Sequence, residues 1–137
     1  MIDITPLENQ LGEEIKTAVL AEFPTAFITD EYVPSPTDFP CLSIVFVSNS
    51  VRSNAATSDE TENFADLAIE VNGYSNRVSG KKQECDRLMA IVDGVVSRRN
   101  FVRTMLQPIP NLADATIYRK TGRYSVTVGK DLKLYRR

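Results

Sequence analysis

The stretch Thr116–Val128, TIYRKTGRYSVTV, decides how the fold is read, because its side chains alternate between two kinds. One face of an extended chain would carry apolar and aromatic side chains: Tyr118, Tyr124, Val126 and Val128. The other face would carry polar and basic side chains: Arg119, Thr121, Arg123, Ser125 and Thr127. This period of two predicts a half-buried β-strand or a hairpin, and Gly122 would mark a turn or a bulge. The question is whether the arginine face meets solvent, a nucleic acid or another subunit.

Further strands are expected upstream of this stretch. Residues 26–33, AFITDEYV, and residues 101–107, FVRTMLQ, read as short strands. Residues 41–52, CLSIVFVSNSVR, are apolar on both faces, which predicts a strand at the centre of a sheet with a layer packed on each side. Residues 63–74 alternate cleanly, so we expect residues 41–52 and 63–74 to form a hairpin with a long connection.

Two helices are expected. The first spans residues 6–22, where Thr5 can cap the start, Pro6 suits the first turn and the apolar residues follow helical spacing. The second spans about residues 80–98. The predicted fold class is therefore α+β, a single mostly antiparallel sheet with two main helices packed on it. The 137 residues fit one domain, 1–137, with a flexible loop at about 50–62 and a basic tail at about 130–137.

Charge is distributed unevenly along the chain, although the net charge is only −2. Residues 1–70 carry 13 acidic and 2 basic residues, whereas residues 71–137 carry 5 acidic and 14 basic residues. Such asymmetry suggests a charged partner or self-association. The alternative is that the two halves interleave their charges on one surface.

The composition argues against catalysis. The chain has no histidine, which removes Ser–His and Cys–His mechanisms and the commonest metal ligand. We expect its two cysteines, Cys41 and Cys85, to be buried, reduced thiols. No glycine pattern matches a phosphate-binding loop, and no acid pair has the spacing of a metal site. We therefore expect no enzyme, no cofactor and no metal. No apolar run is long enough for a membrane span, and the polar N-terminus does not predict a signal peptide.

Nucleic-acid binding is one alternative for the basic half. Arginines and tyrosines interleave near Tyr118 and Arg123, and a sheet displaying both can stack bases and neutralise phosphates. The alternation, however, predicts that the two residue types lie on opposite faces. The overall charge is also negative, whereas nucleic-acid-binding domains are usually basic.

Assembly is the other alternative. A chain with an acidic half and a basic half can make head-to-tail contacts with its own copies, and these contacts close into a ring when the rotation permits. Charge complementarity would fix the register of such contacts more than it would add affinity.

Several stretches resemble the tail terminator, or tail-completion, proteins of long-tailed bacteriophages. They are TPLENQLGEEIKTAVLAEFP at the N-terminus, AIEVNGYSN with GKKQECDRLMAIVDGVV, and FVRTMLQPIPNLADATIYRKTGRYSVTV. The resemblance covers roughly residues 5–128 and rests on the order of elements. It implies a non-enzymatic α+β subunit that forms a hexameric ring at the head-proximal end of the tail, assembled in the bacterial host cytoplasm.

The implied partners are other copies of the chain, the tail tube protein, the head–tail connector and the tail sheath, with DNA only as passing cargo and no membrane. Another connector or tail-tube subunit is the alternative within the same particle. The resemblance supplies no catalytic residues.

Seven charged residues are candidates for the subunit interface. Arg119 and Arg123 are expected at a subunit boundary rather than at a lumen that must release DNA. Arg98 and Arg99 end the second predicted helix, where stabilising the helix dipole is an alternative role. The three acidic candidates lie in the long connection: Asp59, Glu60 and Glu62.

Overall fold

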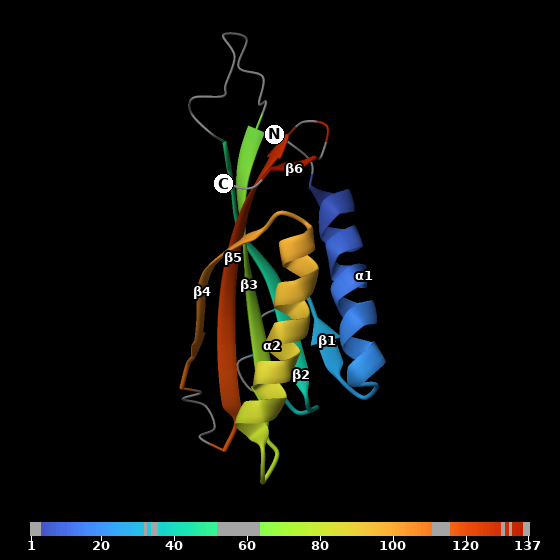
Figure 1. Cartoon of the computed structure of the whole chain (residues 1–137), viewed down its shortest axis with the longest axis vertical. Helices are drawn as coiled ribbons and strands as arrows, with labels where there is room; N and C mark the ends of the chain where they lie inside the picture. The colour runs from blue at the N-terminus through green and yellow to red at the C-terminus, as the bar shows by residue number, and fades with distance from the viewer. Residues whose placement is uncertain are drawn as a thin grey trace.

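The computed structural model describes residues 4–31, 33, 36–51, 64–110, 116–129, 131 and 133–135. Two 18-residue helices and six strands follow one another along this part of the chain (Figure 1). In chain order they are α1 (Thr5–Glu22), β1 (Phe27–Thr29), β2 (Cys41–Val51), β3 (Phe64–Ser75), α2 (Lys81–Arg98), β4 (Val102–Pro108), β5 (Tyr118–Gly129) and β6 (Leu134–Tyr135).

The strands form one mixed sheet in the order β1-β2-β3-β5-β4, with β6 paired to β5. Only β1 and β2 are parallel, and the remaining pairs are antiparallel. The predicted fold class, α+β with two helices on a mostly antiparallel sheet, is confirmed. The predicted hairpin of residues 41–52 and 63–74 is confirmed as the antiparallel pair β2–β3.

The main core lies between the sheet and both helices, which cover the same face (Figure 1). Each helix turns an apolar stripe toward the strands, as helical spacing predicts. The stripe of α1 consists of Leu7, Leu11, Ile15 and Val19, and that of α2 consists of Cys85, Leu88, Met89, Val92, Val95 and Val96. Met89 packs above Gly73 of β3 and Gly122 of β5, where a Cβ would stand 3.3 and 3.0 Å from its side chain. The two glycines therefore let α2 approach the sheet closely.

Residues Tyr118–Gly129 form one uninterrupted strand, β5, and not a hairpin. Tyr124, Val126 and Val128 are buried in the core beneath the helices, while Arg123 is exposed on the opposite face, so the predicted alternation is confirmed. Gly122 marks neither a turn nor a bulge, because it pairs with Val71 and with Leu106 in regular register. The irregularity lies instead on the neighbouring strand β4, after Arg103.

The expectation that β2 carries a layer on each face is wrong. Both helices lie on the same face of the sheet, and β2 is second from its edge (Figure 1). Residues near the start of β2 are covered on the other side by the chain before it, where the Ser43 hydroxyl donates a 2.8 Å hydrogen bond to the carbonyl of Glu31. Farther along, Val45 is half-buried and Val47 is 44% exposed. The apolar side chains of β2 that point away from the helices are thus only partly buried within one chain.

Other boundaries lie close to those predicted. The helices begin at Thr5 and Lys81, with Ile4 and Gly80 at the N-cap positions. The prediction that Thr5 caps the first helix is therefore wrong, because Thr5 is already the first helical residue. Strand β1 covers only Phe27–Thr29 of the predicted 26–33. In the predicted tail, Leu134–Tyr135 forms β6. The predicted loop lies largely outside the described residues, although Val51 still belongs to β2. No helix in the described part of the chain is long and apolar enough to cross a membrane.

Candidate assembly surface

The arginine face of β5 meets the neighbouring strand β3 of the same chain. Arg123 pairs with Glu70 directly across the two strands, with the guanidinium Nε and Nη2 at 3.0 and 2.9 Å from Oε1. Arg119 donates from Nε and Nη2 to Asn72 Oδ1, at 3.0 and 2.8 Å. Cross-strand pairs of this kind stabilise a sheet and fix its register. The question raised by the sequence is therefore answered in part: these two arginines are held by their own chain.

The same face continues as a polar ladder between β3 and β5. Thr121 donates to Asn72 Oδ1 at 2.6 Å, and Thr127 donates to Asp66 at 2.9 Å. Asn72 and Thr121 are buried, so the hydrogen bond between them is shielded from water. We call this side of the sheet, which faces away from both helices, the open face. Because Glu70 neutralises Arg123, the open face is a weaker site for phosphates than its arginines alone suggested.

Of the other predicted interface residues, Arg98 and Arg99 lie at the C-terminal end of α2. The guanidinium of Arg99 contacts Glu14 of α1 at 2.6 Å, and Arg87 of α2 pairs with Glu22 of α1. Arg98 is the basic residue of the last turn, where it suits the helix dipole. Asp59, Glu60 and Glu62 lie outside the described residues.

The two halves of the chain lie toward opposite edges of the sheet, with β3 between them. We call the two lateral halves of the molecule its acidic side and its basic side. The acidic side comprises α1, β1 and β2; the described residues between 4 and 51 carry seven acidic side chains and one basic side chain. The basic side comprises α2, β5 and β4; the described residues between 76 and 129 carry ten basic and three acidic side chains. The ion pairs between α1 and α2 neutralise part of this charge. The strand order nevertheless converts the asymmetry of the sequence into an asymmetry across the molecule.

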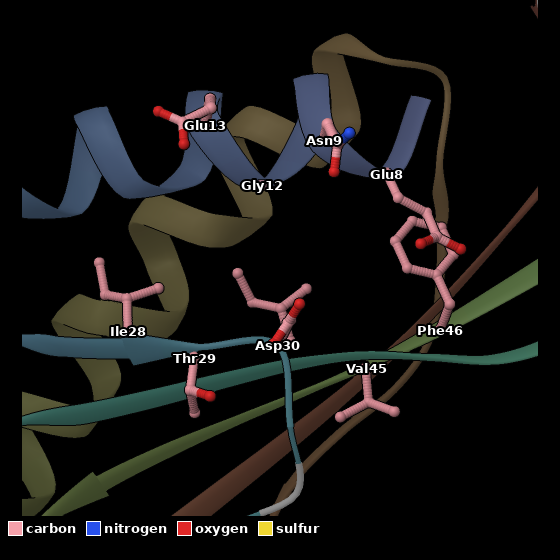
Figure 2. Close-up of a pocket in the computed structure, with 10 residues that line it drawn as sticks. Glu8, Asn9, Gly12, Glu13, Ile28, Thr29, Asp30, Val45 and Phe46 are labelled. Carbon is pink, nitrogen blue, oxygen red and sulfur yellow. The ribbon is translucent and has the colours of Figure 1, made fainter. Parts of the chain in front are cut away.

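A groove of about 500 Å³ opens on the acidic side, between α1 and the strands β1 and β2 (Figure 2). It exists because β1 is short: its pairing with β2 ends at Thr29 and Ser43, whereas β2 continues to Val51. In the described part of the chain, no strand pairs with β2 on this side beyond Ser43. The groove is lined by apolar side chains at its floor and by acids along its rim. The floor includes Ile28, Ile44 and Phe46, and the rim includes Glu8, Glu13 and Asp30.

The acidic rim was missed by the sequence analysis, which placed the acidic candidates in the connection after β2. Glu13 and Asp30 take part in no ion pair within the described residues. An available signal was the excess of acids in residues 1–70. The sequence pattern did not show that β1 ends at Thr29, which leaves the acidic rim beside the unpaired edge of β2.

Reactive chemistry is sparse in the described residues. They contain no group of three or more His, Cys, Asp or Glu side chains that could hold a metal ion. Both cysteines are free and buried, as predicted. Burial, with a smaller contribution from Asp38, raises the pKa of the Cys41 thiol to about 11. Burial and then Glu84 raise the pKa of Cys85 to about 12, so neither thiol is a ready nucleophile.

The hydroxyl of the buried Tyr124 makes a contact between the sheet and α2. Tyr124 donates a 3.1 Å hydrogen bond to Asp93, and the pKa of Tyr124 is raised by burial and by that carboxylate. Asp93 also lies 3.5 Å from Arg103 of β4. This arrangement secures the helix on the strands and places the guanidinium of Arg103 on the helix side of the sheet edge.

Comparison with known proteins finds no family model that matches the sequence and no curated protein with significant similarity to it. The surfaces described above therefore carry the functional argument, together with the resemblance stated from the sequence.

Proposed function

We propose that this protein is a ring-forming assembly subunit of a phage tail or a phage-tail-like particle, of the tail terminator type. Copies join head to tail into a ring that caps the tail tube, stops its polymerisation and presents a surface to the head connector. The resemblance noted in the sequence supplies the kind of particle and the hexameric number.

The observation that carries the proposal is the separation of charge between the two sides of one sheet. An acidic side and a basic side on one molecule complement each other when copies meet head to tail. A two-fold dimer formed through either side would instead place like charges together. Head-to-tail contacts close into a ring when the repeated rotation completes a full turn, and otherwise continue as a helical filament.

The edges of the sheet support the same proposal. Strand β4 ends the sheet on the basic side, and β2 has a free edge beside the groove on the acidic side. Exposed strand edges are templates for pairing with another chain, and closing a ring removes them. Val45, half-buried on the open face, and Val47, exposed at the register shift of β2, are additional apolar surface that assembly can cover.

The test is solution mass measurement and negative-stain microscopy across a concentration series, with and without purified tail tubes. We expect single rings, or caps confined to one end of the tubes. Long cylinders would instead assign the protein as a tube subunit of the same particle. A monomer that ignores tubes at every concentration would refute the proposal; salt-dependent retention of DNA by that monomer would then favour nucleic-acid binding.

A further inference from the structure

We infer that the sheet continues from copy to copy: β4 of one subunit adds to the free edge of β2 in the next, inside the groove beside α1. The inference rests on the proposed ring and names its main contact. The occupant of the groove is thus an extended segment of a second copy of this chain.

The two edges match in position along the sheet. The register across β2, β3, β5 and β4 puts Arg103 level with Phe46, and Met105 level with Val45. The part of β2 that β1 leaves free begins at this level, directly after Ser43. Residues Val102–Leu106 of a neighbour's β4 can therefore lie beside it without displacement along the strands. The last two residues, Gln107 and Pro108, are level with Ser43 and Leu42, where β1 already occupies the edge, so they lie beyond the shared pairing.

The strand directions also match. β2 and β5 both run opposite to β3, and β4 runs opposite to β5, so β4 and β2 point in opposite directions. A rotation about an axis roughly along the strands preserves this relation between neighbouring copies. The added pair is then antiparallel, the more stable arrangement of two strands. The same rotation keeps all helices on one side of the extended sheet.

The side chains complement one another across this contact. Arg103 lies on the helix side of β4, since it contacts Asp93 of α2, and its side chain is 53% exposed. The groove that would receive it lies on the helix side of β2 and carries Glu13 and Asp30 on its rim (Figure 2). Charge-assisted hydrogen bonds between a guanidinium and carboxylates are among the stronger polar contacts at an interface. On the open face, Val45 and Met105 would meet as an apolar pair.

Cysteine cross-linking tests the contact directly. In one chain, the strands of Val45 and Met105 are separated by three interstrand spacings, about 14 Å, whereas a disulfide requires Cα atoms within about 7 Å. The double variant Val45→Cys with Met105→Cys therefore links copies rather than a single chain. Mild oxidation, or a bismaleimide shorter than that separation, should give a ladder of covalent oligomers up to the closed ring. Each single variant serves as a control and should give no ladder, because the native thiols are buried.

A charge test is independent of this chemistry. Arg103→Glu should lower the fraction of protein in rings at least tenfold, and adding Glu13→Lys on the same chain should restore most of it. Lys82→Glu, on the exposed surface of α2, makes the same charge change away from both edges and should leave assembly unchanged. Circular dichroism checks that every variant remains folded.

The outcomes separate the two proposals. If the native protein forms rings but the double cysteine variant forms rings without a ladder, the strand contact is wrong and the proposed function stands. The same conclusion follows if Arg103→Glu and Lys82→Glu assemble equally well. If the native protein forms no ring under any condition, the proposed function fails and the strand contact fails with it.

Discussion

Replacing Asn72 by alanine should remove a large part of the stability of the monomer. Oδ1 of Asn72 accepts three hydrogen bonds, two from Arg119 and one from Thr121. A hydrogen bond to a charged group contributes about 1.5–3 kcal/mol, and a buried hydroxyl deprived of its acceptor costs about 1–3 kcal/mol. Because Asn72 is fully buried and Thr121 is nearly so, water does not replace the lost acceptor. We expect the free energy of unfolding to fall by about 2.5–6 kcal/mol.

The matched control is Arg123→Ala, which removes a more exposed rung of the same ladder. The side chain of Arg123 is 53% exposed in its pair with Glu70, so its loss should cost about 1 kcal/mol or less. Urea unfolding followed by circular dichroism, at a protein concentration where the chain is monomeric, measures both values. The reasoning is refuted if Asn72→Ala is no less stable than Arg123→Ala.

Three further predictions concern the core. At pH 8, Cys41 should react with iodoacetamide about 100-fold more slowly in the native protein than in urea, because its raised pKa of about 11 lowers the thiolate fraction. Equal reaction rates in the two states would contradict the burial of Cys41. The pKa values of Cys41 and Cys85 rise from 9.0 on folding, so the unfolded chain loses these protons at a lower pH than the native protein. The urea concentration at the midpoint of unfolding should therefore fall as the pH increases above about 9. An unchanged midpoint between about pH 8 and 10 would argue against this linkage. Gly122→Ala places a methyl group 3.0 Å from the Met89 side chain and should lower the free energy of unfolding by about 1–3 kcal/mol. A lower melting temperature would show this effect, whereas an equal or higher one would show that the Met89 side chain moves aside without cost.

The local structure was largely predictable from the sequence. Helical spacing located both helices, and alternation located β3 and β5 and assigned Arg123 and Tyr124 to opposite faces. These patterns depend on neighbouring residues, so no knowledge of distant contacts was needed.

The partners of those faces were not predictable in the same way. The pairing of Arg123 with Glu70 joins residues 53 positions apart, and it depends on β3 and β5 being neighbours in the sheet. Alternation places each residue on a face but does not choose the adjacent strand. Alternation likewise does not show what covers a face: the apolar second face of β2 suggested another layer of structure, whereas Val45 on that face is only half-buried.

The central position of β3 has a consequence for the order in which the chain folds. β2 and β3 follow each other along the sequence, so their pairing closes only the loop between them. The other edge of β3 must wait for β5, which follows α2 and β4; Asp66 and Thr127, for example, are 61 positions apart. Closing so long a segment costs conformational entropy before its contacts form, and non-local pairing of this kind slows folding. The docking of β5 on β3 is therefore the step at which the acidic and basic halves become one domain.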